Sequence, residues 1–452
     1  MPEEPAFDTV MKMLRDPAFA GAAGDSVRNY LSLEELSERS TPEGLSTQQL
    51  WELLSAIRRF SATTFPIPIV AGERVWYTIT VDGMRCLRTI ERHCRSDSRL
   101  HQMVQRRSGQ RFLVSSRIRE AIATCLADDV AVDAAELERM LREGRAPRTP
   151  EERLVANTYA MLREEESLVE EDFSPELVTY LFERTTHGLD PGEVTRSVTE
   201  NRGVPWVFRD LVKAYRPPQL GPQAARTSDL AAEALGRICD YANGRTGDPR
   251  EPVAARGYML LAAFGYWHPL PDFNATVARH VLKLLSVKQG FPGLGYIPIS
   301  EMSRRWSLGQ VDPGDVRYSK IQPAVPTSGG IDVTAEILTH LQLTVVAIDH
   351  LLTRIQSTKA ENEAMRLRLR DTEDLNYRQR DVLNRALRDP GAEFTLREHR
   401  LSFHTAYSTA RADLLELVEM GFLDKEARNL AFVFSPVADL RDRIRGEHRD
   451  TE

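Results

Sequence analysis

The stretch His268-Pro-Leu-Pro-Asp-Phe-Asn-Ala-Thr-Val-Ala-Arg279 decides how this sequence is interpreted. It carries a histidine, a carboxylate four residues later, an asparagine and a terminal arginine. It follows an apolar helical pattern, Ala254–Trp267, and leads into a second one, Val277–Ser286. Because a helix N-terminus offers unpaired amides and the positive end of a dipole, this order predicts a loop that opens an anion site. The same residues are also compatible with a plain helix stop, in which Asp272 or Asn274 caps the next helix.

Helical patterns dominate the rest of the chain. Ser46 with Gln49 three residues later predicts a capping box, and Gly144 predicts a helix C-cap. Residues 63–80 are rich in β-branched and aromatic side chains and predict a short hairpin around Ala71-Gly72-Glu73. The further predicted helices cover 84–107, 114–127, 133–143, 150–166, a segment opened by Ser174-Pro175, 226–243 and 251–267. The predicted fold class is therefore mainly α.

The C-terminal part has a different pattern. A long helical segment, with a charged second half, is predicted from about Val333 to Asp374. Three shorter helical stretches and a strand-like segment then follow, which is the order of a winged helix-turn-helix. The stretches are Gln379–Leu387, Leu396–His399, Thr405–Met420 and Asn429–Phe434. Polar residues at 440–452 predict a frayed tail.

Composition excludes several classes of protein. A chain of 452 residues predicts two or three domains. The net charge of −7 gives no general attraction to nucleic acid or to an anionic membrane. No apolar run reaches the roughly 20 residues that span a bilayer, and the first residues lack a secretory h-region. The four cysteines fit neither CxxC metal spacing nor a disulfide framework. We therefore expect a cytoplasmic protein that does not enter a membrane.

The motif at 268–279 resembles that of the Fic family, His-Pro-Phe-x-Asp/Glu-Gly-Asn-Gly-Arg-x-x-Arg. That family transfers AMP from ATP to a protein hydroxyl. The resemblance implies that His268 is the general base and that Asp272 holds Mg²⁺. It also implies that Asn274, Thr276 and Arg279 line the phosphate site. ATP, Mg²⁺ and a target hydroxyl are thus the implied cofactors and partner.

Three positions depart from the motif. Phe273 and Ala275 replace glycines that let the backbone approach phosphate, and Thr276 replaces the first arginine. One lost charge-assisted contact is worth roughly 1.5–3 kcal/mol. Upstream, Thr124 and Asp128 resemble a degenerate inhibitory helix, in which the family's glutamate pairs with the second motif arginine.

The resemblance extends over residues 30–435 and implies a helical core with a small β-hairpin flap at Gly203–Pro218. The implied domains are an N-terminal helical extension with a short hairpin (1–110), a Fic-like core (111–330), a connecting helix (331–374), a winged helix-turn-helix (375–440) and a polar tail (441–452).

Three functions stay open. The first is a divergent enzyme that still transfers AMP with His268 as base. The second is a repurposed fold acting on a substrate other than ATP, and the third is a non-catalytic binding or regulatory protein that uses its winged helix. Residues 376–434 hold nine Lys and Arg against nine Asp and Glu. Protein interaction or homodimerisation is therefore at least as well supported as DNA binding.

Overall fold

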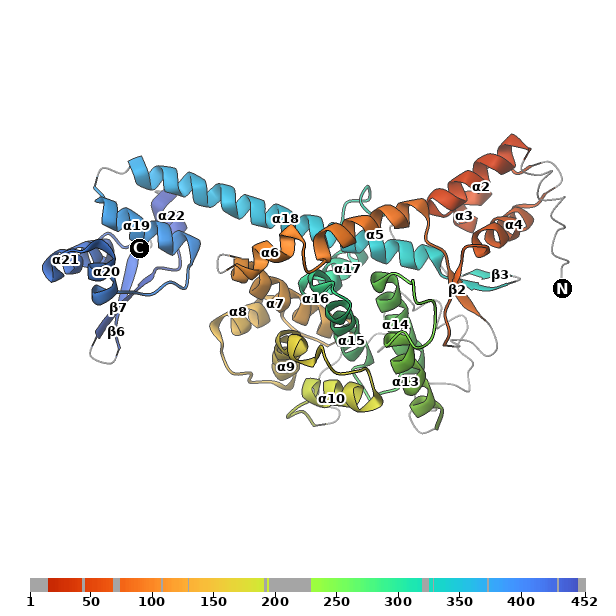
Figure 1. The fold of residues 1–452 in the computed structure, drawn as a ribbon, viewed down its shortest axis with the longest axis horizontal. Coiled ribbons are helices and arrows are strands. Elements are labelled where there is room, and N and C mark those ends of the chain that lie inside the picture. The colour runs from red at the N-terminus through yellow and green to blue at the C-terminus, as the bar shows by residue number, and fades with distance from the viewer. Residues whose placement is uncertain are drawn as a thin grey trace. The chain divides into compact units, whose positions relative to one another are not determined.

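The computed structural model describes residues 15–42, 45–67, 74–106, 109–128, 130–190, 193–194, 229–318, 325–327, 329–371, 374–428 and 431–445. Within these residues the chain is mainly helical, as predicted (Figure 1). The predicted flap at Gly203–Pro218 and the turn at Ala71–Glu73 lie outside the described residues. The chain forms two compact units, 1–350 and 351–452. The boundary falls inside the long helix α18, Thr334–Asp371.

The first unit begins with short helices whose ends are fixed by local side chains. Ser46 accepts a hydrogen bond from the Gln49 amide, and the Gln49 side chain accepts one from the Ser46 amide, which confirms the predicted capping box. Gly144 adopts φ 66° and ends α8, as predicted. The early helices are α2 (Pro17–Asn29), α3 (Leu33–Ser37), α4 (Thr47–Arg59), α5 (Val81–Cys94), α6 (Arg99–Gln105), α7 (Gln110–Leu126) and α8 (Ala134–Glu143).

Helix α15, Asn274–Lys288, lies at the centre of the first unit and is buried over nearly its whole length. It packs against α14, α16, α7, α9 and α10. Burial on all sides places even the polar side chains of this helix, among them Arg279, His280 and Lys283, in the interior. The remaining helical segments are α9 (Pro150–Glu164), the 3₁₀ turn η2 (Glu165–Leu168), α10 (Pro175–Thr185), α13 (Asp229–Ala242), α14 (Val253–Trp267), α16 (Pro292–Tyr296) and α17 (Ile299–Ser307).

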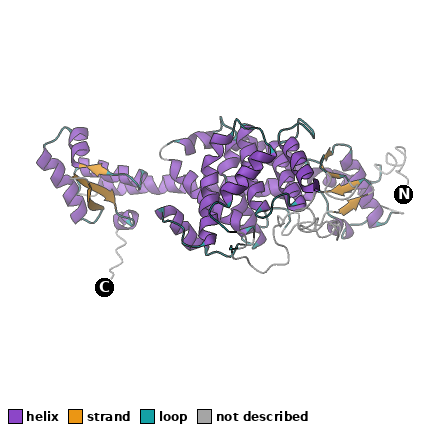
Figure 2. Cartoon of the chain, turned by 90° about the horizontal axis from the view of Figure 1, so that it is seen from below, coloured by secondary structure: helices purple, strands orange, loops and turns teal. Residues whose placement is uncertain are grey.

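The strands form two small sheets (Figure 2). In the first unit, β1 (Thr63–Thr64) pairs antiparallel with β2 (Val75–Tyr77), which confirms the predicted hairpin pairing in a shortened form. The sequence did not predict the parallel pairing of β2 with β4 (Gly330–Asp332), or that of β4 with β3 (Val325–Thr327). This sheet joins segments that are far apart in the chain.

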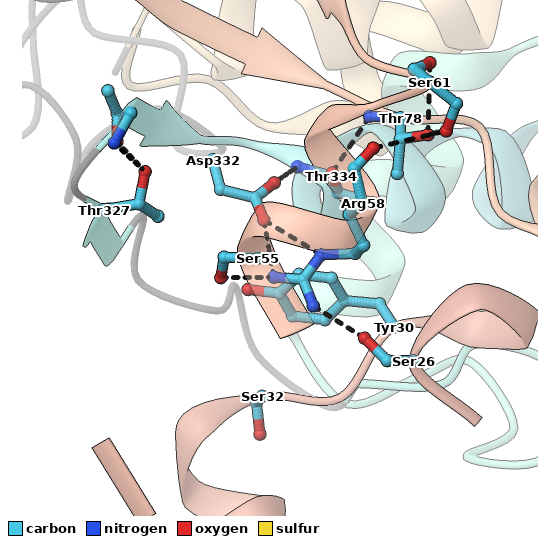
Figure 3. A network of polar contacts seen from close by, with 12 residues as sticks. Ser26, Tyr30, Ser32, Ser55, Arg58, Ser61, Thr78, Thr327, Asp332 and Thr334 are labelled. Atoms are coloured by element: carbon cyan, nitrogen blue, oxygen red, sulfur yellow. Dashed lines mark hydrogen bonds and ion pairs between the residues drawn. The ribbon is translucent and has the colours of Figure 1, made fainter. Parts of the chain in front are cut away.

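A buried ion pair connects the N-terminal extension to this sheet (Figure 3). The Arg58 guanidinium donates to Asp332 Oδ2 at 2.7 Å and to the hydroxyls of Ser26 and Ser55. The Tyr30 ring lies 4.6 Å from the Arg58 guanidinium carbon, in cation–π geometry. Arg58 thus links α2 and α4 to the end of β4.

One helix in the described part of the chain meets the length and composition of a membrane span: Thr334–Leu369, within α18. Of its most apolar window, 72% is buried inside the protein. Leu338, Leu341 and Ile348 are among its buried side chains. A core helix passes the same test of length and composition, and burial identifies this part of α18 as a core helix of the first unit.

The second unit has the element order that the sequence predicted for a winged helix-turn-helix, three helices followed by a β hairpin. Its sheet has the strand order β5-β7-β6 and is antiparallel throughout. The elements are α19 (Tyr377–Arg388), β5 (Phe394–Thr395), α20 (Leu396–Phe403), α21 (Tyr407–Glu419), β6 (Leu423–Arg428) and β7 (Ala431–Pro436).

The predicted fraying from residue 440 is wrong for its first six residues, which form α22, Leu440–Arg445. Leu440 is buried in the core of the second unit, and Ile444 packs against the same core. Arg441 also donates to the carbonyl of Leu387. Two apolar side chains spaced four apart anchor a segment that its polar composition alone had predicted to be loose.

Two buried histidines predict a pH dependence of stability. Burial lowers the pKa of His280 and that of His340 from 6.5 to about 3. The folded state therefore keeps both rings neutral, while the unfolded chain protonates them below pH 6.5. The stability from these groups is complete above pH 6.5 and falls as the pH drops toward 3. The expected loss is up to about 1.4 kcal/mol per pH unit for each ring.

Urea unfolding between pH 7 and pH 5 tests this expectation. All five tryptophans lie before residue 350, so tryptophan fluorescence reports on the first unit. Replacing His340 by phenylalanine keeps a ring against Tyr258, which stacks on it at 4.5 Å. The variant should lose stability less steeply with falling pH than the unmodified protein. An equal slope for the two proteins would contradict the assignment.

Candidate functional site

The 268–279 segment forms the connection between two buried helices. Helix α14 ends at Trp267, and His268 follows in the left-handed conformation with φ 44°. Phe273 is also left-handed, with φ 50°, and α15 starts at Asn274. A left-handed non-glycine residue costs roughly 1–2 kcal/mol. The loop therefore keeps a glycine-like backbone at Phe273, one of the two positions where the sequence departs from glycine.

Packing accounts for the phenylalanine at this strained position. The Phe273 side chain is 6% exposed and belongs to a core cluster with side chains of α7, α8 and α9. Burying an aromatic side chain stabilises by about 1.5–3 kcal/mol, which is enough to offset the backbone strain. Phe273 therefore anchors the loop to the core.

Asn274 closes the loop on itself. Its side-chain oxygen accepts a hydrogen bond from the Leu270 amide at 3.0 Å, and its amide group donates to the Leu270 carbonyl at 3.0 Å. The same amide nitrogen lies 3.5 Å from Nδ1 of His268. His268 itself is only 2% exposed. The structure thus brings together two residues of the predicted site, but in a buried loop.

Asp128 reaches the first turn of α15. Its Oδ2 accepts hydrogen bonds from the backbone amide of Thr276, at 2.8 Å, and from the Thr276 hydroxyl. Thr276 is the third residue of α15, so its amide is one of those that have no partner inside the helix. Both side chains are buried, because Asp128 and Thr276 are each inaccessible to solvent. A carboxylate of this chain therefore binds the helix N-terminus at which the sequence predicted a phosphate.

Arg279 is directed into the protein core. Its Nε donates to the Ser300 hydroxyl at 3.0 Å, and its Nη1 donates to the Ala275 carbonyl at 2.8 Å. Burial lowers the pKa of Arg279, whereas the charges of Asp128 and Glu120 act in the opposite direction. Ser300 is the second residue of α17, and its hydroxyl also donates to Glu120 Oε1.

Glu120 and Lys283 complete the buried polar network around Arg279 and Ser300, and the sequence pattern predicted a role for neither. Glu120 forms an ion pair with Lys283 at 3.1 Å, and both side chains are almost fully buried. Lys283 also donates to the carbonyls of Leu294 and Ile297. The sequence holds only a weak signal for this ion pair. Lys283 lies four residues after Arg279, so the largely apolar run Val277–Ser286 carries two cations on one helix face. Charges in an apolar helix are expected to be paired when the helix is buried.

Thr124 lies in the same interior region. Its hydroxyl donates to the Ser300 hydroxyl at 3.4 Å, and Ser300 in turn donates to Glu120. Of the two residues predicted for an inhibitory helix, Asp128 contacts the 268–279 segment, whereas Thr124 contacts Ser300. The Asp128 contact goes to Thr276, whereas the family pattern implied a contact to Arg279.

Asp272, which was predicted to hold Mg²⁺, makes a local contact at the start of α15. Its Oδ1 accepts the amide of the next residue, Phe273, at 2.8 Å, which is a local turn contact. No group of three or more His, Cys, Asp or Glu side chains suited to a metal ion exists among the described residues. The α15 amide that would face a phosphate oxygen is bound to Asp128. The first turn of α15 is thus occupied by a carboxylate of this chain, and the binding of Mg²⁺ and ATP stays a prediction.

Comparison with known proteins gives a distant structural similarity and no match by sequence. No family model matches the sequence, and no curated protein matches it. The chain is similar to the crystal structure of a Fic family protein from Desulfovibrio desulfuricans G20, with a TM-score of 0.44 and 15% sequence identity. The match covers 80% of this chain and 98% of that one. At this distance, the chemistry of the 268–279 segment depends on the residues of this chain alone.

Proposed function

We propose that this chain is a non-catalytic, Fic-like binding or regulatory protein, in which the 268–279 segment is a structural connection. The observation that carries the proposal is the contact of the Asp128 carboxylate with the amide and hydroxyl of Thr276. A phosphate and a buried carboxylate compete for the same helix N-terminus, and like charges repel at this distance. The contact therefore disfavours a nucleotide phosphate at α15.

The environment of His268 supports the same proposal. A general base must come within about 3 Å of the proton that it accepts. His268 is 2% exposed, and the neighbouring Asn274 is held by two hydrogen bonds to Leu270. A target hydroxyl would have to displace this loop to reach the imidazole. Arg279 would likewise have to leave Ser300 and Ala275 to contact a phosphate.

A second candidate is an AMP-transferring enzyme whose site is closed by Asp128. One observation favours it: the closing contact comes from a single side chain that directly follows α7, while His268 and Asn274 remain next to each other. Removal of that one carboxylate would then open the anion site. The two candidates predict different results for the same variant.

The expected result for the unmodified protein is no change in melting temperature with millimolar ATP and Mg²⁺, and no incorporation of labelled AMP into itself or a lysate. Asp128→Ala should lower the free energy of unfolding by about 1.5–3 kcal/mol, because a charge-assisted hydrogen bond is lost. It should still show no response to ATP. Thermal shift and autoradiography measure the two effects.

Asp133→Ala is the matched control, because Asp133 is a second carboxylate that accepts helix-start amides, those of Ala135 and Glu136 in α8. Asp133→Ala should lower the free energy of unfolding by about 1 kcal/mol. It should leave the contact of Asp128 with the start of α15 intact. If Asp128→Ala gains AMP transfer that the added change His268→Ala abolishes, the closed-enzyme candidate is correct and the proposal fails.

The cytoplasmic location, a homodimer and a target hydroxyl stay predictions.

A further inference from the structure

We infer that the face formed by α20 and the first half of α21 binds the phosphate backbone of double-stranded DNA. The inference concerns the second unit only, so it stands whether or not the core transfers nucleotide. It rests on how charge is distributed over this unit once the ion pairs are known. The equal numbers of cations and anions in the sequence hide that distribution.

The helix-turn-helix segment 396–412 holds three arginines and one glutamate. The arginines are Arg397, Arg400 and Arg411, and all three side chains are exposed. Within the described residues, none of the three forms an ion pair. The one glutamate, Glu398, is neutralised by Arg385 at 3.1 Å. This segment therefore presents three uncompensated positive charges.

Most acidic residues of the unit lie outside the α20 and early α21 face or are already bound, whereas Glu416 is exposed in the second half of α21 and accepts a hydrogen bond from Gln379. Asp413 is buried and accepts from Arg378, Asn376 and His399. Glu393 and Glu426 both bind Arg428. The exposed carboxylates Asp381, Glu419 and Asp424 belong to α19, the end of α21 and the start of β6. Phosphate binding needs unopposed cations in one place, and this arrangement supplies them.

The contacts of Asp413 hold the three helices in a fixed relation. Arg378 donates from Nε at 2.6 Å and from Nη2 at 2.9 Å, which joins the start of α19 to α21. His399 of α20 lies 2.9 Å from the same carboxylate. Such a buried, fully bonded network limits rearrangement of the helices. The spacing of Arg397, Arg400 and Arg411 is therefore set before any ligand binds, which reduces the entropy cost of binding.

The exposed side of α21 carries the short side chains of a helix that can approach a groove. Ala410, Leu414 and Leu417 face the core. The exposed side holds Ser408, Arg411 and Ala412 in the first half of the helix and Glu416 and Glu419 in the second half. Tyr407, at the start of the helix, is 57% exposed. Small residues next to an arginine permit close contact with a duplex, in which an α-helix fits the major groove. Leu401 of α20 is also 57% exposed. Two exposed apolar side chains make a smaller apolar surface than we would expect for a protein partner, so duplex DNA is favoured.

The test is a salt titration with the full-length protein and a 30-base-pair duplex, followed by fluorescence anisotropy. Three phosphate contacts predict a slope of log affinity against log salt of about −2.7, which is about a 40-fold loss between 50 and 200 mM salt. Arg411→Ala should weaken binding about tenfold at low salt and reduce the slope by about one. The triple replacement of Arg397, Arg400 and Arg411 by alanine should abolish measurable binding.

Arg388→Ala is the matched control, because Arg388 is an exposed arginine of the same unit that ends α19. It should leave affinity and slope unchanged, and circular dichroism should show that every variant is folded. No binding at 50 mM salt, an equal effect of Arg388→Ala and Arg411→Ala, or tighter binding to double-stranded RNA would each overturn the inference. So would a protein dimer that forms through this face, detected as a shift in sedimentation that Arg411→Ala removes.

Discussion

Replacing Arg58 by methionine is expected to lower the free energy of unfolding of the first unit by about 3–5 kcal/mol. The guanidinium is buried against Asp332, with side-chain exposures of 1% and 0%. Methionine fills much of the same volume but leaves the Asp332 carboxylate buried without its cation. The hydroxyls of Ser26 and Ser55 lose their donor as well. Urea unfolding followed by tryptophan fluorescence measures the loss, since Trp51 lies beside Arg58.

Two companion variants make this result interpretable. Arg59→Met changes the next residue, which is exposed, and should stay within about 0.5 kcal/mol of the unmodified protein. Adding Asp332→Asn to Arg58→Met should recover part of the loss, because the neutral amide keeps an acceptor for the Thr334 amide. If Arg58→Met costs less than 1 kcal/mol, the ion pair does not join the extension to the sheet in the way described.

Replacing Glu120 by glutamine is expected to cost a similar amount, about 3–5 kcal/mol. Glutamine keeps the shape of the side chain but removes the charge that Lys283 faces at 3.1 Å. The ammonium would then remain in the interior without a counter-charge, and neutral carbonyl oxygens such as those of Leu294 and Ile297 would be its acceptors. The same unfolding experiment measures the change, since the pair lies in the first unit.

A double-mutant comparison separates charge from packing. Adding Lys283→Met to Glu120→Gln removes the stranded cation and should restore at least half of the lost stability. Glu143→Gln, at the exposed end of α8, is the control for a lost carboxylate and should be near neutral. Equal stability of the single and double variants would show that the Lys283 charge is not what makes Glu120 necessary.

Much of the local structure could be predicted from neighbouring residues. The capping box at Ser46 and Gln49 and the left-handed Gly144 are both present. The helix-turn-helix order after residue 375 is also present as elements. Each depends on residues within one or two turns of each other, so the hydrogen bonds that define it are visible in the sequence. The polar segment at 440–445 was mispredicted because its anchor, Leu440, packs on residues distant in the chain.

The candidate site was predictable only as a location. The sequence alone predicted a loop that begins at His268, between the helical patterns Ala254–Trp267 and Val277–Ser286. It also determined that Phe273 and Thr276 change the phosphate-binding turn. It could not show that Phe273 keeps a left-handed backbone, with φ 50°, by packing its ring against α7–α9.

The partners of the buried polar residues depend on the tertiary structure. Asp128 and Thr276 are separated by 148 positions, and Glu120 and Lys283 are still farther apart in the chain. Their contacts arise because α7 packs along α15, a result of burying apolar surface from many residues at once. Helix periodicity and caps are encoded within a few residues. A buried carboxylate contacts its partner only once the whole core has assembled. The sequence therefore predicted an anion site at the start of α15, and the structure shows that the Asp128 carboxylate binds there.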